Sequence, residues 1–597
     1  VSEVLGISKK KCEQFCKAYM ETRSARKLIN LLAPFNISAP QAVKLRQELG
    51  TDAQRLLMEF PYMVFERDLI DFEIADQLAQ ASGIPQNAPE RLAAGLIYAL
   101  KQAEHEGHLC MHKESFVRRA VNLLRAPQVT WKAVAQRAFE MIKEGRLSLF
   151  NDYVYRPIMA KAEEDVATWI CDMLHRDRLP YMGDLDDEID GQQTEMGFTF
   201  AEEQRHAIRT ALTSPICIIS GGPGTGKTSI QRAILNIYKK AFPDSDVVCC
   251  APTGRAARRM EQSTGYPAST IHKVLNLTAG EVHELKDIDL LEADLVLVDE
   301  VSMMDMLTTW YLFNALPPSC RLILVGDADQ LPSVGPGAVL NELLACGQLP
   351  AVILDKVFRQ SEGSLVAENA QRIRHGVTDL EFGDDFQFWP SAEETQSAQY
   401  LMWFYKREVD RYGVDNVALL TPFRKKSKTG VYSLNAALHD TINPASQEKD
   451  EIETGQRILR VGDKVMQMKN RDFASNGDIG YICTSKRDSD GILVEVDFGD
   501  DRVVAYEDAE SLRQVELAYA ATIHKSQGSE YDAVLINIQN MHGKMLNRAL
   551  IYTAETRAKK QVIIVGDWEA VVRAIQTADT KRRNTMLAVR INDLTKE

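Results

Sequence analysis

Apolar residues recur at spacings of three and four along the first part of the chain, as in Ala42, Leu45 and Leu49. This period places the apolar side chains on one face of a helix. We expect an all-helical region over residues 1–130 and a helical connector over residues 131–195. The connector ends in an acidic stretch with little apolar content, which predicts a linker around Asp184–Asp190.

From about residue 196 the pattern changes to short apolar runs that alternate with helix-compatible stretches. Such alternation predicts an α/β fold, with parallel sheets that carry helices on both faces. The first α/β domain, over residues 196–345, contains the apolar runs 216–219, 247–250, 295–298 and 322–325. The second, over residues 346–455 and 515–597, contains the runs 352–354, 417–420, 534–536 and 562–565.

A segment of different character interrupts the second α/β domain over residues 456–514. Its short apolar runs are separated by turn residues, among them Asn476-Gly477. This pattern predicts a small inserted β-barrel. A shorter insert at residues 276–290 has Ala279-Gly280 between alternating residues and predicts a β-hairpin.

Composition narrows the class of protein. The chain has 597 residues, 70 of them basic and 84 acidic, with a net charge of -14. This balance argues against a protein that coats nucleic acid with a uniformly positive surface, but it leaves room for a local basic channel. The ten cysteines are scattered and no apolar run approaches the ~20 residues of a membrane span. We expect a cytoplasmic protein with reduced thiols, and a further segment before Val1.

One local cluster contains residues that can bind a metal. His105, His108, Cys110 and His112 fall within eight positions. No second ligand group stands at a paired spacing typical of structural zinc. We therefore do not expect a zinc site here.

A glycine-rich turn follows the apolar run at 216–219, and it reads Gly-Gly-Pro-Gly-Thr-Gly-Lys-Thr from Gly221 to Thr228. Glycines let the backbone wrap tightly enough to aim several N–H groups at phosphate oxygens, and the following helix N-terminus adds partial positive charge. Lys227 can then reach the β- and γ-phosphates, while the Thr228 hydroxyl can coordinate Mg²⁺. We expect a nucleoside triphosphate to be bound by Gly222, Pro223, Gly224, Thr225, Gly226, Lys227, Thr228 and Ser229.

Two further strands of the first α/β domain end in polar residues. The run 295–298 leads directly into Asp299 and Glu300. Carboxylates at the end of a buried strand are costly unless they serve a cation or a proton. Asp299 is expected to hold Mg²⁺, and Glu300 to orient and deprotonate the attacking water. After the run 322–325, Gln330 is placed to sense the γ-phosphate.

With these residues in place, the chain resembles the RecD-like branch of the superfamily 1 helicases. Eight motifs carry the resemblance in order along residues 200–591: GGPGTGKTS, APTGRAARRM, STIHKVL, VLVDEVSMMD, VGDADQLPSVGPGAVL, VFRQ, YAATIHKSQGSEYD and YTAETRAKK. The resemblance implies two RecA-like P-loop domains, an SH3-like barrel at 456–514, and a strand-separating pin at 276–290.

The resemblance also implies roles at the nucleotide. Gln204 would read the adenine and Glu530 would contact the ribose. Arg359 and Arg557 would be arginine fingers delivered from the second domain, which can be worth ~10³ to 10⁵ in rate. The expected catalytic residues are Lys227, Glu300, Gln330, Arg359 and Arg557, and the expected metal ligands are Thr228 and Asp299.

Contacts to a single DNA strand are implied in the same way. The resemblance places them at Thr253, Arg255, Thr270 and His272 in the first domain and at Thr522 and His524 in the second. Hydroxyl, imidazole and backbone contacts to phosphates bind without regard to sequence, as a translocase requires. Hydrolysis that opens and closes the cleft would let the two domains advance alternately.

The N-terminal region contains Val4-Leu5-Gly6-Ile7-Ser8, Phe60-Pro61-Tyr62 and Gly107-His108-Leu109-Cys110. With these segments it resembles the helix-hairpin-helix region of the stand-alone, long RecD-like helicases. Where those proteins usually carry Gly-Ile-Gly-Phe, this chain has Leu69-Ile70-Asp71-Phe72. Without the glycines, backbone N–H groups approach a phosphate less easily, and Asp71 repels one. We expect that this hairpin does not bind DNA.

The resulting expectation is an ATP- and Mg²⁺-dependent 5′-to-3′ DNA helicase and translocase, active in repair or recombination. It would act as a monomer on single-stranded and forked DNA, with single-strand-binding protein as a candidate partner. The helicase part of a conjugative relaxase-helicase is an alternative, although the histidine triad of a relaxase is missing near the N-terminus. An RNA helicase remains open because ATP motifs do not report the 2′-hydroxyl. A scaffold with a decayed ATPase conflicts with the intact motif residues.

Overall fold

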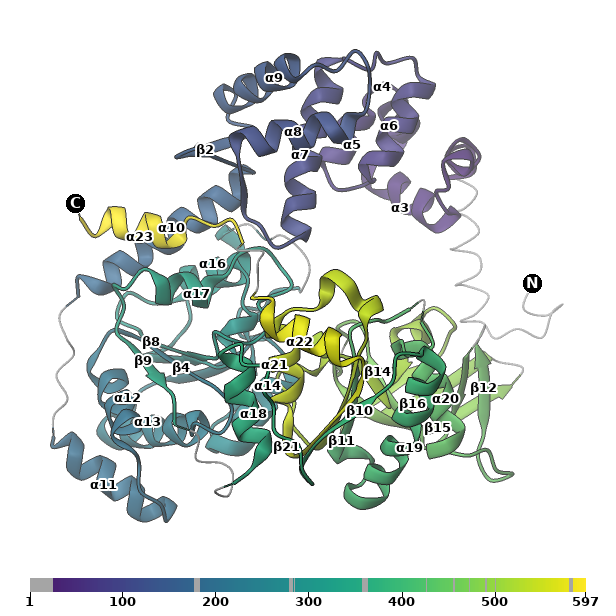
Figure 1. The fold of residues 1–597 in the computed structure, drawn as a ribbon. Coiled ribbons are helices and arrows are strands. Elements are labelled where there is room, and N and C mark those ends of the chain that lie inside the picture. Colours follow the sequence, from purple (N-terminus) through teal and green to yellow (C-terminus); the bar gives the residue numbers. More distant parts are fainter. Residues whose placement is uncertain are drawn as a thin grey trace, which may run out of the picture. The chain divides into compact units, whose positions relative to one another are not determined.

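The computed structural model describes residues 25–176, 183–278, 283, 285–356, 363–425, 427–454, 457–471, 473–488, 491–499, 501–578 and 583–596 (Figure 1). The chain divides into two compact units. The first unit consists of Val1–Glu163, Gly335–Gly337 and Arg583–Thr585, and the second of Glu164–Val334, Ala338–Arg582 and Met586–Glu597.

The first unit is predominantly helical. Its helices are α3 (Ala39–Leu49), α4 (Ala53–Glu59), α5 (Pro61–Glu66), α6 (Phe72–Ala81), α7 (Pro89–His105), α8 (Lys113–Leu124) and α9 (Trp131–Lys143). A small antiparallel sheet that the sequence pattern did not predict has the order β1-β3-β2, from Cys110–His112, Tyr153–Tyr155 and Ser148–Phe150. Helix α9 buries Val134, Ala138 and Met141 in the same core as α4 to α8. Helix α9, which the sequence assigned to the helical connector, is therefore part of the core of the first unit.

The altered hairpin lies between α5 and α6. Ile70 and Phe72 are buried in the core of this unit, while Asp71 is exposed just before α6 begins. Phe72 stacks on Tyr98 at a centroid distance of 4.7 Å and meets Phe65 edge-on at 5.6 Å. Apolar packing thus fixes the turn in this chain.

The first α/β sheet is wholly parallel, with the order β6-β5-β7-β8-β4-β9. Its strands are β4 (Ile216–Gly221), β5 (Val247–Ala251), β6 (Ala268–Thr270), β7 (Leu295–Val298), β8 (Arg321–Gly326) and β9 (Ala351–Leu354). Helices α11 (Leu185–Met196), α12 (Glu202–Thr213) and α13 (Lys227–Ala241) share a core with these strands. The other helices around this sheet are α10 (Pro157–Leu174), α14 (Gly254–Thr264), α15 (Ile271–Val274), α16 (Met306–Ala315) and α17 (Val339–Ala345).

Strand β9 corrects the predicted domain boundary. The sequence assigned the run 352–354 to the second α/β domain, but β9 pairs with β4, with Val352 opposite Ile219. An apolar run predicts a strand but does not show which strand it pairs with. The predicted boundary between the two α/β domains therefore fell before the last strand of the first sheet.

The acidic stretch predicted as a linker is the start of helix α11. Asp184 caps the helix by accepting a hydrogen bond from the Asp186 N–H at 2.9 Å. Asp186 pairs with Arg205 of α12 at 3.1 Å, and Ile189 is fully buried. Acidic side chains in the first turn interact favourably with the helix dipole and stabilise α11. The low apolar content of this stretch led the sequence analysis to predict a linker instead of a helix.

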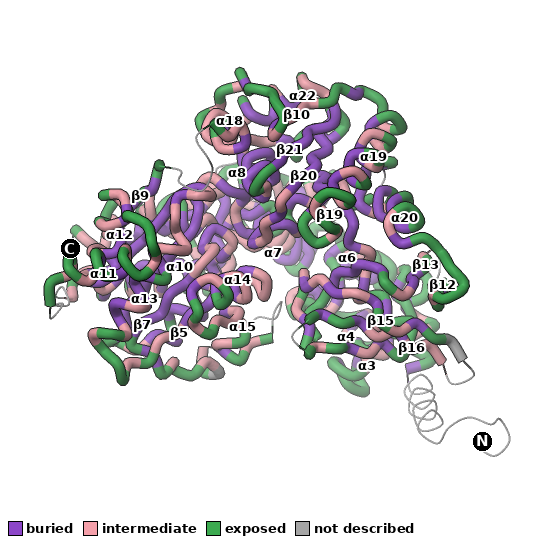
Figure 2. Tube along the Cα trace, turned by 90° about the horizontal axis from the view of Figure 1, so that it is seen from below, coloured by how far each residue is buried: buried purple, intermediate pink, exposed green. Residues whose placement is uncertain are grey.

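The second α/β sheet is also parallel, with the order β10-β21-β20-β11-β19. Its strands are β10 (Phe386–Pro390), β11 (Val417–Thr421), β19 (Ala520–Thr522), β20 (Tyr531–Ile538) and β21 (Ala558–Gly566). The surrounding helices are α18 (Leu365–Arg374), α19 (Glu394–Tyr412), α20 (Val431–Ile442), α21 (Arg548–Glu555) and α22 (Trp568–Gln576), and α23 (Leu587–Leu594) follows them in the chain. Figure 2 shows the central strands β20 and β21 as buried, in keeping with their continuous apolar runs.

The inserted barrel is a five-stranded antiparallel sheet with the order β17-β16-β15-β14-β18. Its strands are β14 (Lys464–Gln467), β15 (Ile479–Asp488), β16 (Gly491–Asp497), β17 (Val503–Tyr506) and β18 (Val515–Leu517), and a hairpin of β12 (Glu451–Thr454) and β13 (Arg457–Arg460) precedes them. The barrel insert is thus confirmed, although β12 and β18 extend it beyond 456–514 at both ends. Within the insert 276–290, residues 279–282 and 284 lie outside the described residues, and the described part contains a short 3₁₀ helix, Leu285–Asp287.

Candidate nucleotide and DNA site

The glycine loop connects the buried strand β4 to the first turn of α13. Gly224 and Gly226 have φ angles of +77° and +86°, a conformation that side chains with a Cβ rarely adopt. Lys227 is the first residue of α13, and its Nζ donates to the carbonyl oxygens of Gly221 and Gly222, at 3.0 Å for Gly222. Burial lowers the pKa of the Lys227 amine, while the charges of Asp327 and Glu300 act in the opposite direction. The loop therefore presents a cation and free helix N–H groups to one point.

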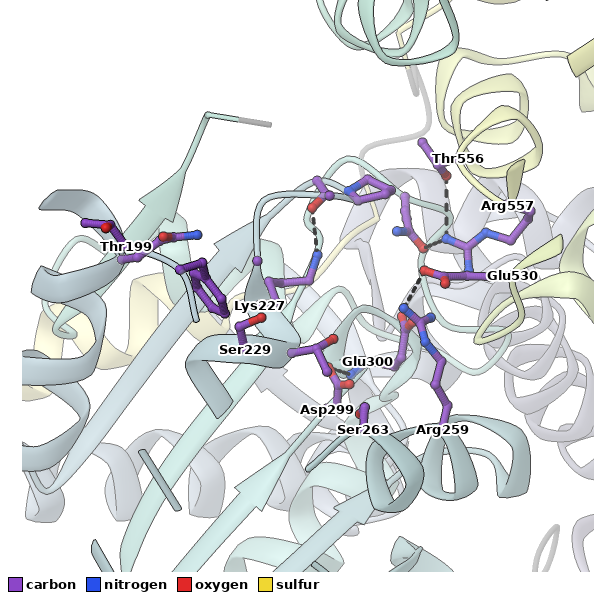
Figure 3. A pocket seen from close by; sticks show the side chains of 18 residues that line it. Thr199, Lys227, Ser229, Arg259, Ser263, Asp299, Glu300, Glu530, Thr556 and Arg557 are labelled. Carbon is purple, nitrogen blue, oxygen red and sulfur yellow. Dashed lines mark hydrogen bonds and ion pairs between the residues drawn. The ribbon is translucent and has the colours of Figure 1, made fainter. Parts of the chain in front are cut away.

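A cavity of about 500 Å³ opens over this loop, and Figure 3 shows the side chains that line it. Most of the predicted nucleotide residues meet there: Gln204, Gly222, Pro223, Gly224, Gly226, Lys227, Thr228, Ser229, Asp299, Glu300, Gln330, Glu530 and Arg557. Thr225 is fully buried beneath the loop and donates to the Gly222 carbonyl at 2.9 Å. Arg359 lies outside the described residues.

Two carboxylates stand at the end of strand β7. Asp299 accepts a hydrogen bond from the Glu300 N–H at 2.8 Å. Glu300 itself has a left-handed φ of +53°, which is uncommon for a residue with a side chain. Burial, followed by the neighbouring charge of Glu300, raises the pKa of Asp299. A divalent cation would relieve this cost, so the oxygen ligands present here fit Mg²⁺.

A further carboxylate, Asp327, is buried and was missed by the sequence reasoning. It follows strand β8 and accepts hydrogen bonds from Gln330 at 3.0 Å and from the Tyr552 hydroxyl at 3.2 Å. Burial raises its pKa, and the charge of Lys227 lowers it. The signal that could have found Asp327 is the one used for Asp299, a carboxylate directly after a buried parallel strand.

The second α/β domain contributes Arg557 to the same cavity. Arg557 Nη2 donates to Gln330 Oε1 at 2.8 Å, and its Nε donates to the Thr553 carbonyl at 3.2 Å. The guanidinium is buried, and it meets a residue of the first domain that also lines the cavity. The structure therefore brings together the predicted γ-phosphate sensor and one predicted arginine finger.

Two further residues connect the domains at the edge of this cavity. Arg259 of α14 forms an ion pair with Glu530, which Lys559 also approaches at 3.5 Å. Arg259 was not predicted, because the sequence Arg-Ala-Ala-Arg-Arg does not show which arginine contacts the second domain. Gln204 lies at another edge of the cavity, within the first domain. Its amide oxygen accepts a hydrogen bond from the Ala201 N–H, and its amide nitrogen donates one to the Thr225 carbonyl, both at 2.9 Å.

The predicted DNA contacts at Thr270 and Thr522 lie in two similar segments, each a short edge strand followed by a short helix. Thr270 ends β6, an edge strand of the first sheet, and Thr522 ends β19, an edge strand of the second. Each threonine begins the sequence Thr-Ile-His-Lys and caps a short helix, by accepting from the Lys273 N–H at 3.2 Å and from the Lys525 N–H at 3.4 Å. Free N–H groups at such helix starts are suited to phosphate oxygens.

Three of the four predicted first-domain contacts line two separate cavities, and Thr253 lines neither of them. Thr270 and His272 line one of about 870 Å³, together with residues of the barrel. Burial lowers the pKa of His272, which favours the neutral ring. Arg255 lines another cavity of about 580 Å³, where its Nη1 donates to Ser529 Oγ at 2.8 Å. Thr253 caps α14 by accepting from the Ala256 N–H at 3.3 Å.

Family models match four stretches of the chain. The ATP-dependent RecD2 DNA helicase HHH domain matches residues 21–110, and the ATP-dependent RecD-like DNA helicase SH3 domain matches residues 434–498. An AAA domain matches residues 204–336, and a UvrD-like helicase C-terminal domain matches residues 517–565.

Curated relatives and a solved structure resemble the chain to different extents. The ATP-dependent RecD2 DNA helicase of Deinococcus radiodurans is 31% identical over 614 residues, covering 99% of this chain and 81% of that protein. The RecBCD enzyme subunit RecD of Mycobacterium tuberculosis is 28% identical over 557 residues, covering 85% of this chain and 92% of that protein. A crystal structure of a Bacteroides Pif1 helicase with ADP-AlF3 and ssDNA is 18% identical, with a TM-score of 0.41 and coverage of 67% of this chain and 98% of that one.

These matches agree with the geometry. The helical N-terminal region, the two parallel sheets and the inserted barrel are confirmed as parts of one helicase. None of the described helices is long and apolar enough to cross a membrane. The identity to the Deinococcus protein extends over nearly the whole chain, and most of the predicted nucleotide residues line one cavity. The chain belongs to the RecD2 family of ATP-dependent DNA helicases.

Proposed function

We propose that this helicase moves 5′ to 3′ along single-stranded DNA and unwinds forked DNA in repair or recombination. The contact that best supports a motor is the hydrogen bond between Arg557 and Gln330, because it connects the two α/β domains at the nucleotide cavity. A change at the nucleotide can in this way change the relation between the domains.

ATP and Mg²⁺ are the proposed substrate and cofactor. Thr228 and Asp299 would hold the metal, which would neutralise phosphate charge when bound. Glu300 would position the attacking water and accept its proton. Lys227, Arg557 and, by family resemblance, Arg359 would meet the charge that develops on the transferred phosphoryl group. Gln204 would contact the adenine and Glu530 the ribose.

The strand contacts support a sequence-independent grip. Thr270 with His272 and Thr522 with His524 come from different sheets, so each α/β domain would hold the backbone through its own helix start. Thr253 and Arg255 would add to the grip of the first domain. Alternating release of the two grips would convert hydrolysis into movement.

The environment and assembly of the protein are proposals of the same kind. We infer that it works in the cytoplasm as a monomer, with single-strand-binding protein as a candidate partner. The described cysteines are free, and all of them except Cys483 are buried. Reduced thiols of this kind are usual in cytoplasmic proteins.

The test is unwinding of forked substrates that carry only a 5′ or only a 3′ single-stranded tail, in DNA and in RNA, with ATP and Mg²⁺. We expect unwinding of the DNA fork with the 5′ tail. Unwinding only from the 3′ tail would overturn the polarity, and unwinding only of RNA would overturn the substrate class. Omission of Mg²⁺ should abolish the activity.

A further inference from the structure

A loop of the inserted barrel, residues 470–478, reaches the proposed strand contacts of both α/β domains. We call it the barrel loop, and it joins β14 to β15. Asn476 Oδ1 accepts a hydrogen bond from Lys525, which lies next to His524 in the second domain. Asp478 forms an ion pair with Arg258 of α14 in the first domain. The loop is therefore fixed at the place where the two proposed grips face the strand.

Internal hydrogen bonds hold the described residues of this loop in one conformation. Arg471 donates its N–H to the Ala474 carbonyl at 2.8 Å, and the Asn476 N–H donates to Asn470 Oδ1 at 2.8 Å. Arg502 of the barrel donates to the Phe473 carbonyl at 3.1 Å. A loop so tied has little conformational entropy left to lose when it binds a ligand.

Phe473 is the unusual residue of the barrel loop. Its side chain is 75% exposed, the second highest exposure among the exposed large apolar residues of the described chain. Its φ of +66° lies in the left-handed region, which is strained for a bulky residue. An exposed aromatic ring in a strained conformation gains nothing for the stability of the barrel, whose core contains other residues.

The charges near Phe473 suit a polyanion. The cavity of about 870 Å³ that contains Thr270 and His272 is lined by four basic residues, Arg258, Lys273, Arg471 and Arg502, and by two carboxylates, Glu261 and Asp478. Asp478 pairs with Arg258 and with Arg502, so the excess positive charge comes from Lys273 and Arg471. Arg471 is exposed, and its guanidinium lies 4.8 Å from the ring centre of Tyr506. A basic groove beside an exposed aromatic ring is the usual arrangement for single-stranded nucleic acid, with phosphates in the groove and a base on the ring.

We propose that Phe473 stacks on a base of the bound single strand, while Arg471 and Thr270 contact the adjacent backbone. The barrel loop is then a third contact to the strand. It contacts the flat face of a base, whereas the α/β domains contact phosphates. This inference rests on the proposed function, because it requires a single strand in this cavity. Every base has such a face, so the contact does not select a sequence.

The first test compares Phe473→Ala, Phe473→Tyr and a matched control, Trp403→Ala. Trp403 on α19 is also exposed, at 58%, and lines none of the cavities described above. Binding is measured by anisotropy with an oligo-dT strand and with an abasic strand of the same length, over a range of salt concentrations. Thermal melting checks that each variant is folded.

We expect Phe473→Ala to weaken oligo-dT binding by about 5-fold to 100-fold. Binding to the abasic strand and the slope of affinity against salt should not change, since both report phosphate contacts. Phe473→Tyr should bind as the wild type does, and so should Trp403→Ala. Equal loss on both strands, or no loss on oligo-dT, would overturn the inference.

A second test locates the contact directly. A photo-reactive phenylalanine analogue placed at position 473 should crosslink to the oligo-dT strand, whereas the same analogue at position 403 should not. A wild-type protein that binds no single strand would overturn both the proposed function and this inference. Wild-type binding without a crosslink at 473 and without loss in Phe473→Ala would overturn this inference alone.

Discussion

Arg557 in the second α/β domain donates a hydrogen bond of 2.8 Å to Gln330 in the first. Gln330 in turn donates to Asp327 at 3.0 Å, and the charge of Asp327 acts on Lys227 of the glycine loop. The hydrogen bonds thus run from Arg557 in one domain to Asp327 in the other, and the charge of Asp327 acts on Lys227. A change in the relation between the two domains would therefore change the side chains that line the cavity.

Removal of the Arg557 guanidinium should separate nucleotide binding from hydrolysis. We expect Arg557→Ala to lower kcat for ATP by about 10³ to 10⁵. Affinity for a fluorescent ATP analogue should change only a few-fold, because the glycine loop carries most of the binding. Steady-state ATPase assays with single-stranded DNA measure the effect. The control is Arg573→Ala. Arg573 lies on α22, donates a hydrogen bond to Asn540 at 2.8 Å, and does not line the cavity. Equal activity of the two variants would contradict this role of Arg557.

Lys227→Ala should abolish ATP hydrolysis and leave single-strand binding measurable. The amine lies over the glycine loop, where it would contact the β- and γ-phosphates, and it is remote from the Thr-Ile-His-Lys helix starts in sequence and in the sheets. An ATPase assay beside anisotropy with oligo-dT checks both halves. Normal hydrolysis in this variant would show that the nucleotide site is assigned wrongly.

Residues at the ends of buried strands could be predicted from sequence. The glycine loop and Asp299 follow continuous apolar runs, and a parallel sheet brings the carboxyl ends of its strands to one edge. Arg557 required the family resemblance, because its tertiary partner Gln330 lies far away in the sequence. Local pattern contains no information about such a contact.

Pairing between elements could not be predicted for the same reason. The run at 352–354 is a strand as expected, but only contacts with β4 decide that it belongs to the first sheet. Phe473 in the barrel loop is similar, since a phenylalanine in a sequence is most often a core residue. The structure instead exposes it, on a left-handed backbone between Arg471 and Ala474, which are hydrogen-bonded to each other.

The two Thr-Ile-His-Lys helix starts should contribute to DNA binding through their hydroxyl groups. We expect Thr270→Val and Thr522→Val each to weaken oligo-dT binding several-fold and to destabilise the local helix start by about 1 kcal/mol. Thr130→Val is the matched control, because Thr130 caps α9 by accepting from the Ala133 N–H at 3.2 Å. The control should lose similar stability and no DNA affinity. Equal DNA affinity in all three variants would remove these threonines from the strand contacts.

An ion pair joins Asp76 of α6 to Arg91 of α7, with the Arg91 side chain buried and Asp76 partly buried. Arg91 donates to both carboxylate oxygens, at 2.7 and 2.9 Å, and also to the Leu124 carbonyl at 2.9 Å. The Tyr62 hydroxyl adds a hydrogen bond to Asp76 at 2.7 Å. Burial by itself raises the pKa of Asp76, but hydrogen bonds from Arg91 and Tyr62 outweigh it and lower the pKa.

The lowered pKa predicts a dependence of stability on acid. The unfolded chain protonates Asp76 at its ordinary value of 3.8, and the folded chain only at a lower pH. The contribution of the ionised pair is therefore fully present above about pH 4 and is lost as the pH falls through the folded pKa. Protection of α6 and α7 against hydrogen exchange, compared between wild type and Asp76→Asn in the full chain, should differ at pH 7 and converge below pH 3.8.

Arg91→Met should destabilise the first unit more than Asp76→Asn does. Methionine fills a similar volume but leaves the Asp76 carboxylate buried without its cation, which costs about 3–5 kcal/mol. Asparagine keeps a neutral partner that can still accept hydrogen bonds from Arg91 and Tyr62. Because the ion pair lies within the first unit, ATP hydrolysis by the α/β domains should survive in both variants. Loss of stability in the opposite order would contradict the expected cost of leaving the Asp76 carboxylate without its cation.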